Sequence, residues 1–72
     1  MMYYAYQVLV FASMQGKFDS LLAESFPDAD IIEKEPRMYN NIAYTHYTLE
    51  CGRPMRSALD GNPAVFIYKV GY

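Results

Sequence analysis

Residues 3–12 read YYAYQVLVFA, and this stretch decides the fold. Aromatic and β-branched residues, which favour strands, dominate it. Both of its alternating faces are apolar, which is typical of a strand that is covered on at least part of each face. We therefore expect residues 3–12 to form a central strand of a sheet.

The next segment has the periodicity of an amphipathic helix. Between Lys17 and Phe26, apolar residues recur at offsets that place them on one stripe, and Asp19 and Glu24 fall on the opposite side. Pro27 ends this helix, because the residue before a proline disfavours α geometry.

Two strands and a loop are predicted to follow. Residues 29–35 alternate as a half-exposed strand, and residues 36–41 form a loop in which Asn40-Asn41 tolerates the left-handed backbone of a turn. Residues 42–51 form a second strong strand. Its more apolar face is expected to lie toward the core; that face carries Ala43, Thr45, Tyr47, Leu49 and Cys51.

The C-terminal part predicts a short helix and a last strand. Residues 54–60 lie between Pro54 and Gly61, the arrangement expected of a short helix. Residues 64–70 form the last strand, in which simple alternation places Phe66 and Ile67 on opposite faces.

The predicted order is β-α-β-β-α-β within one α+β domain that spans residues 1–72. A four-stranded antiparallel sheet with both helices on one face would be a small ferredoxin-like sandwich. If residues 54–60 form only a turn, the alternative is a β-α-β-β-β sheet with one packed helix. Neither arrangement carries a function by itself.

Composition limits the classes of function. The chain has 72 residues, of which 53% are hydrophobic and 17% aromatic, including eight tyrosines, so a packed core is expected rather than disorder. A net charge of −2 makes nucleic acid an unfavoured partner. The N-terminal apolar run has no preceding positive region and is shorter than the ~20 residues that span a bilayer, so we expect a cytoplasmic protein without a membrane partner.

Catalytic chemistry has few candidate residues. His46, Glu50 and Cys51 have the right side-chain types, but His46 and Cys51 are five apart in one strand and so point to opposite faces. Cys51 is the single cysteine, so no intramolecular disulfide and no Cys/His metal set is expected. We predict a protein that is not an enzyme, with no catalytic residues, no metal and no cofactor.

Tyrosine content favours protein binding. Tyrosine has a large apolar body and a polar tip, which suits it to interfaces. If both helices cover one sheet face, we expect Tyr6, Tyr44 and His46 to lie on the other, open face, with the loop residues Met38 and Tyr39 extending the contact. The partner is another protein or a second copy of the chain. The competing explanation is structural: the tyrosines lie half-buried around the rim of the sheet.

The charge distribution adds a second contact surface. Residues 18–36 carry six acidic residues and one lysine, a net charge of −5, whereas the rest of the chain has a net charge of +3. Asp28, Asp30, Glu33 and Glu35 form the predicted acidic flank. Clustered carboxylates can occupy a basic groove on a partner. This leads to the hypothesis of a phage or mobile-element accessory protein that binds and inhibits a host factor.

Two alternatives remain open at this point. An aromatic sheet face can stack the bases of single-stranded nucleic acid, and Arg53, Arg56 and Ser57 near a helix start are weak candidates for anion binding. The second alternative is a self-associating, dimeric domain that binds a small ligand.

Overall fold

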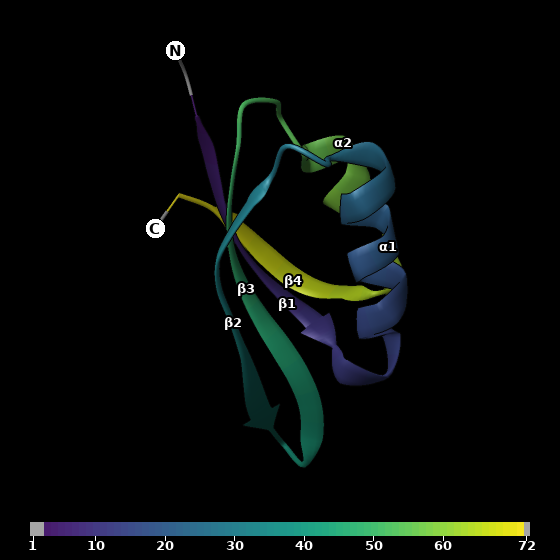
Figure 1. The fold of residues 1–72 in the computed structure, drawn as a ribbon. Coiled ribbons are helices and arrows are strands. Elements are labelled where there is room, and N and C mark those ends of the chain that lie inside the picture. Colours follow the sequence, from purple (N-terminus) through teal and green to yellow (C-terminus); the bar gives the residue numbers. More distant parts are fainter. Residues whose placement is uncertain (1–2, 72) are drawn as a thin grey trace.

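Four antiparallel strands and one main helix make up residues 3–71, the part of the chain that the computed structural model describes (Figure 1). The strands are β1 (Tyr4–Phe11), β2 (Asp30–Tyr39), β3 (Ile42–Cys51) and β4 (Val65–Val70). The helical elements are a 3₁₀ turn, η1 (Ala12–Met14), the main helix α1 (Gln15–Ser25) and the short α2 (Arg56–Leu59). The α+β class predicted from the sequence is confirmed.

The strand order in the sheet is β2-β3-β1-β4, and every neighbouring pair is antiparallel. β1 therefore has partners on both sides, as its two apolar faces predict. The outer strands are β2 and β4. Both helices lie on the same side of the sheet (Figure 1).

The prediction of a complete two-helix sandwich was wrong in one respect. α2 contains only the four residues Arg56–Leu59, a single turn, so the sheet carries one main helix. Asp60 N donates to Arg56 O at 2.8 Å, and Asn62 then closes the segment with a side-chain bond from Nδ2 to Ala58 O at 3.1 Å. A segment between Pro54 and Gly61 is too short to repay helix nucleation by itself. The observed layout is nearer to the alternative with one packed helix.

β2 is longer than the sequence predicts. We expected a strand over residues 29–35 and a loop over 36–41, but pairing with β3 continues through Pro36 to Tyr39. β2 is an edge strand, where the missing N–H of a proline is tolerated. The turn is confined to Asn40 (φ 51°) and Asn41 (φ 64°), so the predicted left-handed asparagines do turn the chain. β3 coincides with the predicted strand.

The core lies between the sheet and the helices, on what we call the helix face. Tyr6, Val8 and Val10 of β1 are 1%, 0% and 0% exposed. The remaining core members are Phe18, Leu22, Phe26, Tyr47, Leu49, Cys51, Met55, Leu59 and Ala64. Met55 N donates a hydrogen bond of 2.9 Å to the Tyr6 hydroxyl, which satisfies this buried oxygen.

The helix α1 forms where the apolar stripe predicts it. Phe18 and Leu22 are its buried residues, and the Phe18 ring packs on Tyr47 of β3 with ring centroids 4.9 Å apart. Phe26 follows the helix as its C-terminal cap, directly before Pro27. Within residues 3–71, no helix is long and apolar enough to cross a membrane.

Candidate binding face of the sheet

The sheet face opposite α1, which we call the open face, is built by the register of four strands. His46 of β3 lies opposite Leu9 of β1 and opposite Glu35 of β2, and side chains of directly paired residues point to the same face. Leu9 in turn lies opposite Ile67 of β4. The same register gives the other members of the open face: Gln7, Phe11, Glu33, Arg37, Tyr39, Ile42, Tyr44, Thr48 and Lys69.

A bulge in β4 adds one more aromatic residue to this face. Leu9 pairs with Ile67 but Val10 pairs with Val65, so Phe66 is the extra residue between them. The Phe66 ring contacts Phe11 and Tyr44 with centroids 5.7 and 5.1 Å away, which places it on the open face beside Ile67. Simple alternation placed Phe66 and Ile67 on opposite faces and was wrong here, because a bulge breaks the two-residue period.

Tyr44 is the centre of an aromatic cluster on the open face. Its ring lies 5.3 Å from Phe11, 5.1 Å from Phe66 and 5.9 Å from Tyr39, centroid to centroid. Tyr44 therefore lies on the predicted face but is only 4% exposed. Its neighbours form the accessible surface instead: Phe66 is 55% and Tyr39 50% exposed.

The placement of Tyr6 on the open face was wrong. Tyr6 pairs with Leu49, and the adjacent Val8 pairs with Tyr47, so both point into the core under α1. The sequence showed that β1 is apolar on both faces but not which face the helix covers. Only the register with β3 decides this.

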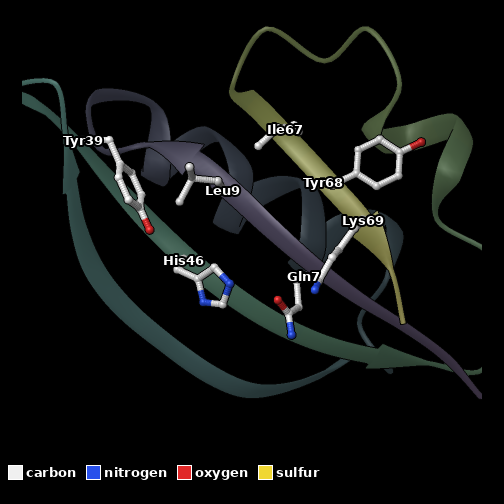
Figure 2. A pocket seen from close by; sticks show the side chains of 7 residues that line it. All are labelled: Gln7, Leu9, Tyr39, His46, Ile67, Tyr68 and Lys69. Atoms are coloured by element: carbon white, nitrogen blue, oxygen red, sulfur yellow. The ribbon is translucent and has the colours of Figure 1, made fainter. Parts of the chain in front are cut away.

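His46 lies on the open face as predicted and lines a shallow hollow of ≈ 230 Å³ (Figure 2). The other lining residues are Gln7, Leu9, Tyr39, Ile67, Tyr68 and Lys69. In Figure 2 the polar ends of Gln7 and Lys69 lie near each other at one end of the hollow. The Nδ1 atom of His46 is buried and has no hydrogen-bond partner among the described residues.

The predicted acidic flank is divided between two places. Glu33 and Glu35 pair with Thr48 and His46 and so border the open face on β2, while Asp30 pairs with Glu50 at the start of that strand. Asp28 lies outside the sheet, 3.1 Å from the guanidinium of Arg53. The four carboxylates are therefore not one surface.

Glu35 is partly neutralised within its own strand. Arg37 Nη2 donates to Glu35 Oε1 at 2.6 Å. This hydrogen bond holds the pKa of Glu35 below its ordinary value and raises the pKa of Arg37. Within residues 3–71, by contrast, Glu33 has no ion pair.

The guanidinium of Arg53 is occupied by hydrogen bonds within the chain and does not form an open anion site. Its Nη2 donates to Ser25 O at 2.6 Å and to Asp28 Oδ1 at 3.1 Å, and its guanidinium lies 5.0 Å from the Phe26 ring centroid. Arg56 and Ser57 belong to the one-turn α2, which is too short to offer a helix-terminal site. The described residues around Arg53, Arg56 and Ser57 therefore give no support for an anion-binding site.

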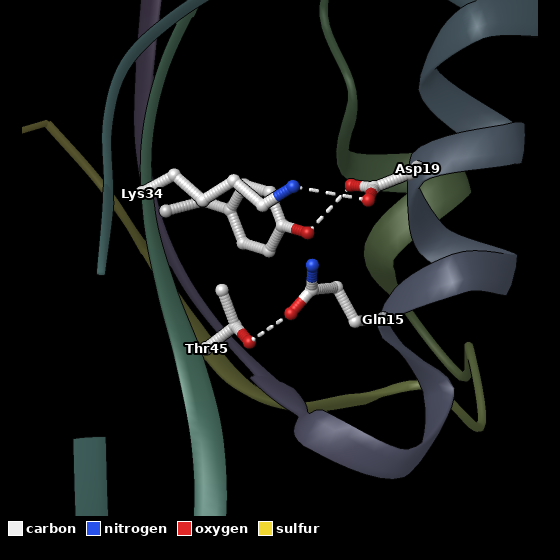
Figure 3. A network of polar contacts seen from close by, with 5 residues as sticks. Gln15, Asp19, Lys34 and Thr45 are labelled. Atoms are coloured by element: carbon white, nitrogen blue, oxygen red, sulfur yellow. Dashed lines mark hydrogen bonds and ion pairs between the residues drawn. The ribbon is translucent and has the colours of Figure 1, made fainter. Parts of the chain in front are cut away.

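On the helix face, a polar network joins α1 to strands β2 and β3 (Figure 3). Tyr47 donates to Asp19 at 2.6 Å, Lys34 pairs with Asp19 at 3.1 Å, and Thr45 donates to Gln15 at 2.6 Å. Desolvation raises the pKa of Asp19, but the hydrogen bonds from Tyr47 and Lys34 outweigh it and lower the pKa overall. Desolvation, and then the bond to Asp19, raise the pKa of Tyr47.

This network was not foreseen from the sequence, and it accounts for another part of the acidic segment. Asp19, one of the six acids in residues 18–36, holds α1 against β2 and β3. Its partners are 15 and 28 residues away along the chain, so local pattern gave no signal for them.

Within the described residues, the structure separates His46 from Cys51 and assembles no metal-binding group. His46 lies on the open face, whereas Cys51 is 1% exposed in the core on the helix face. Across residues 3–71, no three His, Cys, Asp or Glu side chains lie where they could hold a metal ion. The open face is the arrangement that offers accessible apolar groups.

Comparison with known proteins does not extend this description. No protein-family model, no curated protein and no solved structure matches the chain.

Proposed function

We propose that the protein is a non-catalytic protein-interaction module and that the open face of the sheet is its binding surface. The observation that carries this proposal is a group of large apolar side chains, about half exposed, on the sheet face without helices. Ile67 is 61%, Phe66 55%, Tyr39 50% and Ile42 47% exposed.

The position of these side chains supports an interface. Single exposed apolar residues are ordinary, but a contiguous apolar patch on a small protein marks a contact surface. Here Tyr39 and Phe66 flank the buried Tyr44, and Ile42 lies opposite Tyr39 at the hairpin end. An apolar centre with charged residues at its border is the usual anatomy of a protein interface.

The border residues supply the polar part of such an interface. Glu33, Glu35 and Arg37 lie along β2, and Lys69 lies on β4 at the other side of the sheet. Charges at the rim give orientation and association rate more than affinity. The acidic contact predicted from the sequence is thereby reduced to Glu33 and Glu35, next to the apolar patch.

The test uses two exposed isoleucines as a matched pair. Ile67→Asp introduces a charge into the open face, and Ile31→Asp introduces the same charge on the helix face, where Ile31 pairs with Leu49 and is 48% exposed. Tagged wild-type and variant chains are used for affinity capture, with and without nuclease, after far-UV circular dichroism has shown that each is folded.

The proposal expects a protein partner, a second copy included, that survives nuclease, is lost with Ile67→Asp and is retained with Ile31→Asp. Equal capture by both variants contradicts the proposal. A partner that disappears with nuclease would make the open face a nucleic-acid surface instead.

A further inference from the structure

We infer that the open face binds a second copy of this chain, packed face to face about a twofold axis that runs along the strands between β1 and β3. The inference rests on the proposed function, since it names the occupant of the same face. The order of side chains across the sheet, taken row by row, carries it.

One row of the open face has opposite charges at its two ends. Glu33 pairs with Thr48, Thr48 with Gln7, and Gln7 with Lys69, so the row runs from β2 to β4 in that order. A carboxylate stands at one edge, an ammonium group at the other, and two hydrogen-bonding side chains lie between them.

A twofold axis along the strands makes this row complementary to itself. It exchanges the two edges of the sheet, so Glu33 of one copy faces Lys69 of the other, and Thr48 faces Gln7. Such an isologous contact forms each pair twice. Lys69 and Gln7 also line one end of the ≈ 230 Å³ hollow, so the carboxylate of the second copy arrives beside two hydrogen-bond donors.

The row nearer the hairpin is complementary in a different way. Arg37 pairs with Tyr44 and Tyr44 with Phe11, while Phe66 contacts Phe11 from the β4 side. The same axis sets Arg37 of one copy against Phe66 of the other, a cation–π arrangement. It also sets the Phe11 ring against Tyr44. In the row between these two, the same axis sets Leu9 of one copy against His46 of the other. It also sets Ile67 against the stem of Glu35, whose carboxylate accepts from Arg37.

Charge selects this axis over the other face-to-face choice. An axis across the strands, centred on the row of Glu35, would lay β2 on β2 and set the Glu35 carboxylates of the two copies against each other. Like charges facing each other across an interface cost several kcal/mol. Both axes keep the strands of the two sheets in the aligned geometry of packed sheets, about 30° apart, so the charges alone distinguish them.

The size of the face sets the strength of the dimer. Four strands spaced by about 4.8 Å, with about six residues each at about 3.3 Å per residue, give a face of roughly 19 by 20 Å, or roughly 400 Å² per copy. The total of roughly 800 Å² lies below the about 1,200–2,000 Å² of stable interfaces. We therefore expect a dimer with a Kd in the micromolar range, driven by the apolar centre and oriented by the charges.

The experiment is a charge reversal with rescue in the full chain. Sedimentation equilibrium, from micromolar to near-millimolar concentration, compares wild type, Lys69→Glu, Glu33→Lys and the double variant. Lys17→Glu on α1 is the matched control, since it changes the net charge from −2 to −4 as Lys69→Glu does. Circular dichroism melts check that each variant is folded.

We expect each single reversal to raise the dimer Kd by about tenfold or more, because the like-charge contact is made twice. The double variant should return to within about threefold of wild type, and Lys17→Glu should not differ from wild type. Raising salt should weaken the wild-type dimer.

Two outcomes would overturn the inference. A wild-type chain that stays monomeric at all concentrations removes the second copy as the occupant. A dimer that both reversals leave unchanged, or that the double variant fails to restore, removes the proposed axis. In either case an Ile67-dependent capture of a different protein would leave the proposed function standing, so the two failures are distinguishable.

Discussion

The two faces of this sheet both carry clustered aromatic rings, but they bury them in different ways. On the helix face, Tyr6 and Tyr47 are 1% and 0% exposed under α1 and α2, and their hydroxyls bond to Met55 N and Asp19. On the open face no helix covers the rings, yet Tyr44 is 4% exposed because other aromatic side chains surround it.

The difference shows what each cluster can do for the protein. The centre of the helix face is completed within one chain, since Tyr6 and Tyr47 are covered and their hydroxyls are hydrogen-bonded. On the open face only the central ring is buried, and the surrounding Phe66, Tyr39 and Ile67 remain about half exposed. The first cluster is closed to other molecules, and the second leaves apolar side chains exposed around a buried centre. Four predictions, from the largest expected effect to the smallest, test this comparison.

Phe18→Ala on the helix face should have the largest effect on stability. Phe18 is 1% exposed, and its removal leaves a cavity against Tyr47, so we expect a loss of about 3–5 kcal/mol in the free energy of unfolding. Urea unfolding followed by circular dichroism measures it. Phe66→Ala, at 55% exposure on the open face, is the matched control and should cost about 1 kcal/mol or less. Equal losses would mean that the two faces contribute alike.

Tyr44→Ala decides whether the open face has a stabilising centre. The sequence alone predicts that Tyr44 is a contact residue of the open face. At 4% exposure among three rings, its removal should instead cost about 2–4 kcal/mol. Tyr44→Phe keeps the ring contacts and should stay within about 1 kcal/mol of wild type. If Tyr44→Ala melts like wild type, the cluster on this face does not stabilise the fold.

The Asp19 network makes the stability of the helix face depend on pH. The folded-state pKa of Asp19 lies below its value of about 3.9 in the unfolded chain. Its contribution is therefore present above about pH 4 and lost as the pH falls through the lower folded pKa. Allowing for the partial exposure of Asp19, we expect Asp19→Asn to cost about 1 kcal/mol at pH 7.

Urea unfolding at pH 7, 5, 4 and 3 measures this dependence. The difference between wild type and Asp19→Asn should shrink toward zero as the pH falls below about 4. Glu24→Gln, at an exposed acid on the same helix, is the control and should show a smaller difference at pH 7 and little change with pH. A gap that grows in acid would contradict the proposed sign.

The hairpin turn should give the smallest effect, and it tests how the edge of the open face is held in register. Asn41 has φ 64°, so Asn41→Gly relieves a left-handed residue and should raise stability by a few tenths of a kcal/mol. Asn41→Ala should instead cost about 1 kcal/mol. Thermal melts of both variants measure the pair. The same effect from both would show that this turn does not limit the β2–β3 register.

A large part of the fold could be predicted because its signals are local. The alternation in residues 42–51, the helical spacing of Phe18 and Leu22, and the asparagine turn each act within one segment. The errors lie where distant segments interact. Pro36 suggested a loop, but an edge position lets the strand continue through it. Phe66 broke the alternation because of a bulge against β1.

The candidate site was less predictable than the fold. His46 lies on the open face as the sequence predicts, but Tyr6 does not. Glu33 and Glu35, predicted as part of a separate acidic flank, border this face. Phe66, Ile67 and Lys69 were not proposed as contact residues. Alternation sorts the residues of one strand into two faces. It does not show which face of one strand lies on the same side of the sheet as a given face of the next strand, so the residues of a surface are known only once the register is known.

By itself, the sequence determined an α+β protein with an aromatic sheet, one amphipathic helix and a polarised charge, because hydrophobic periodicity, proline and asparagine act through neighbouring residues. Only the tertiary structure decided that α2 is a single turn and that Tyr44 is buried. It also decided that Glu33 and Lys69 lie at opposite ends of one row of side chains across the open face. These features depend on contacts between segments far apart in the chain, and their energies exist only once the strands have paired.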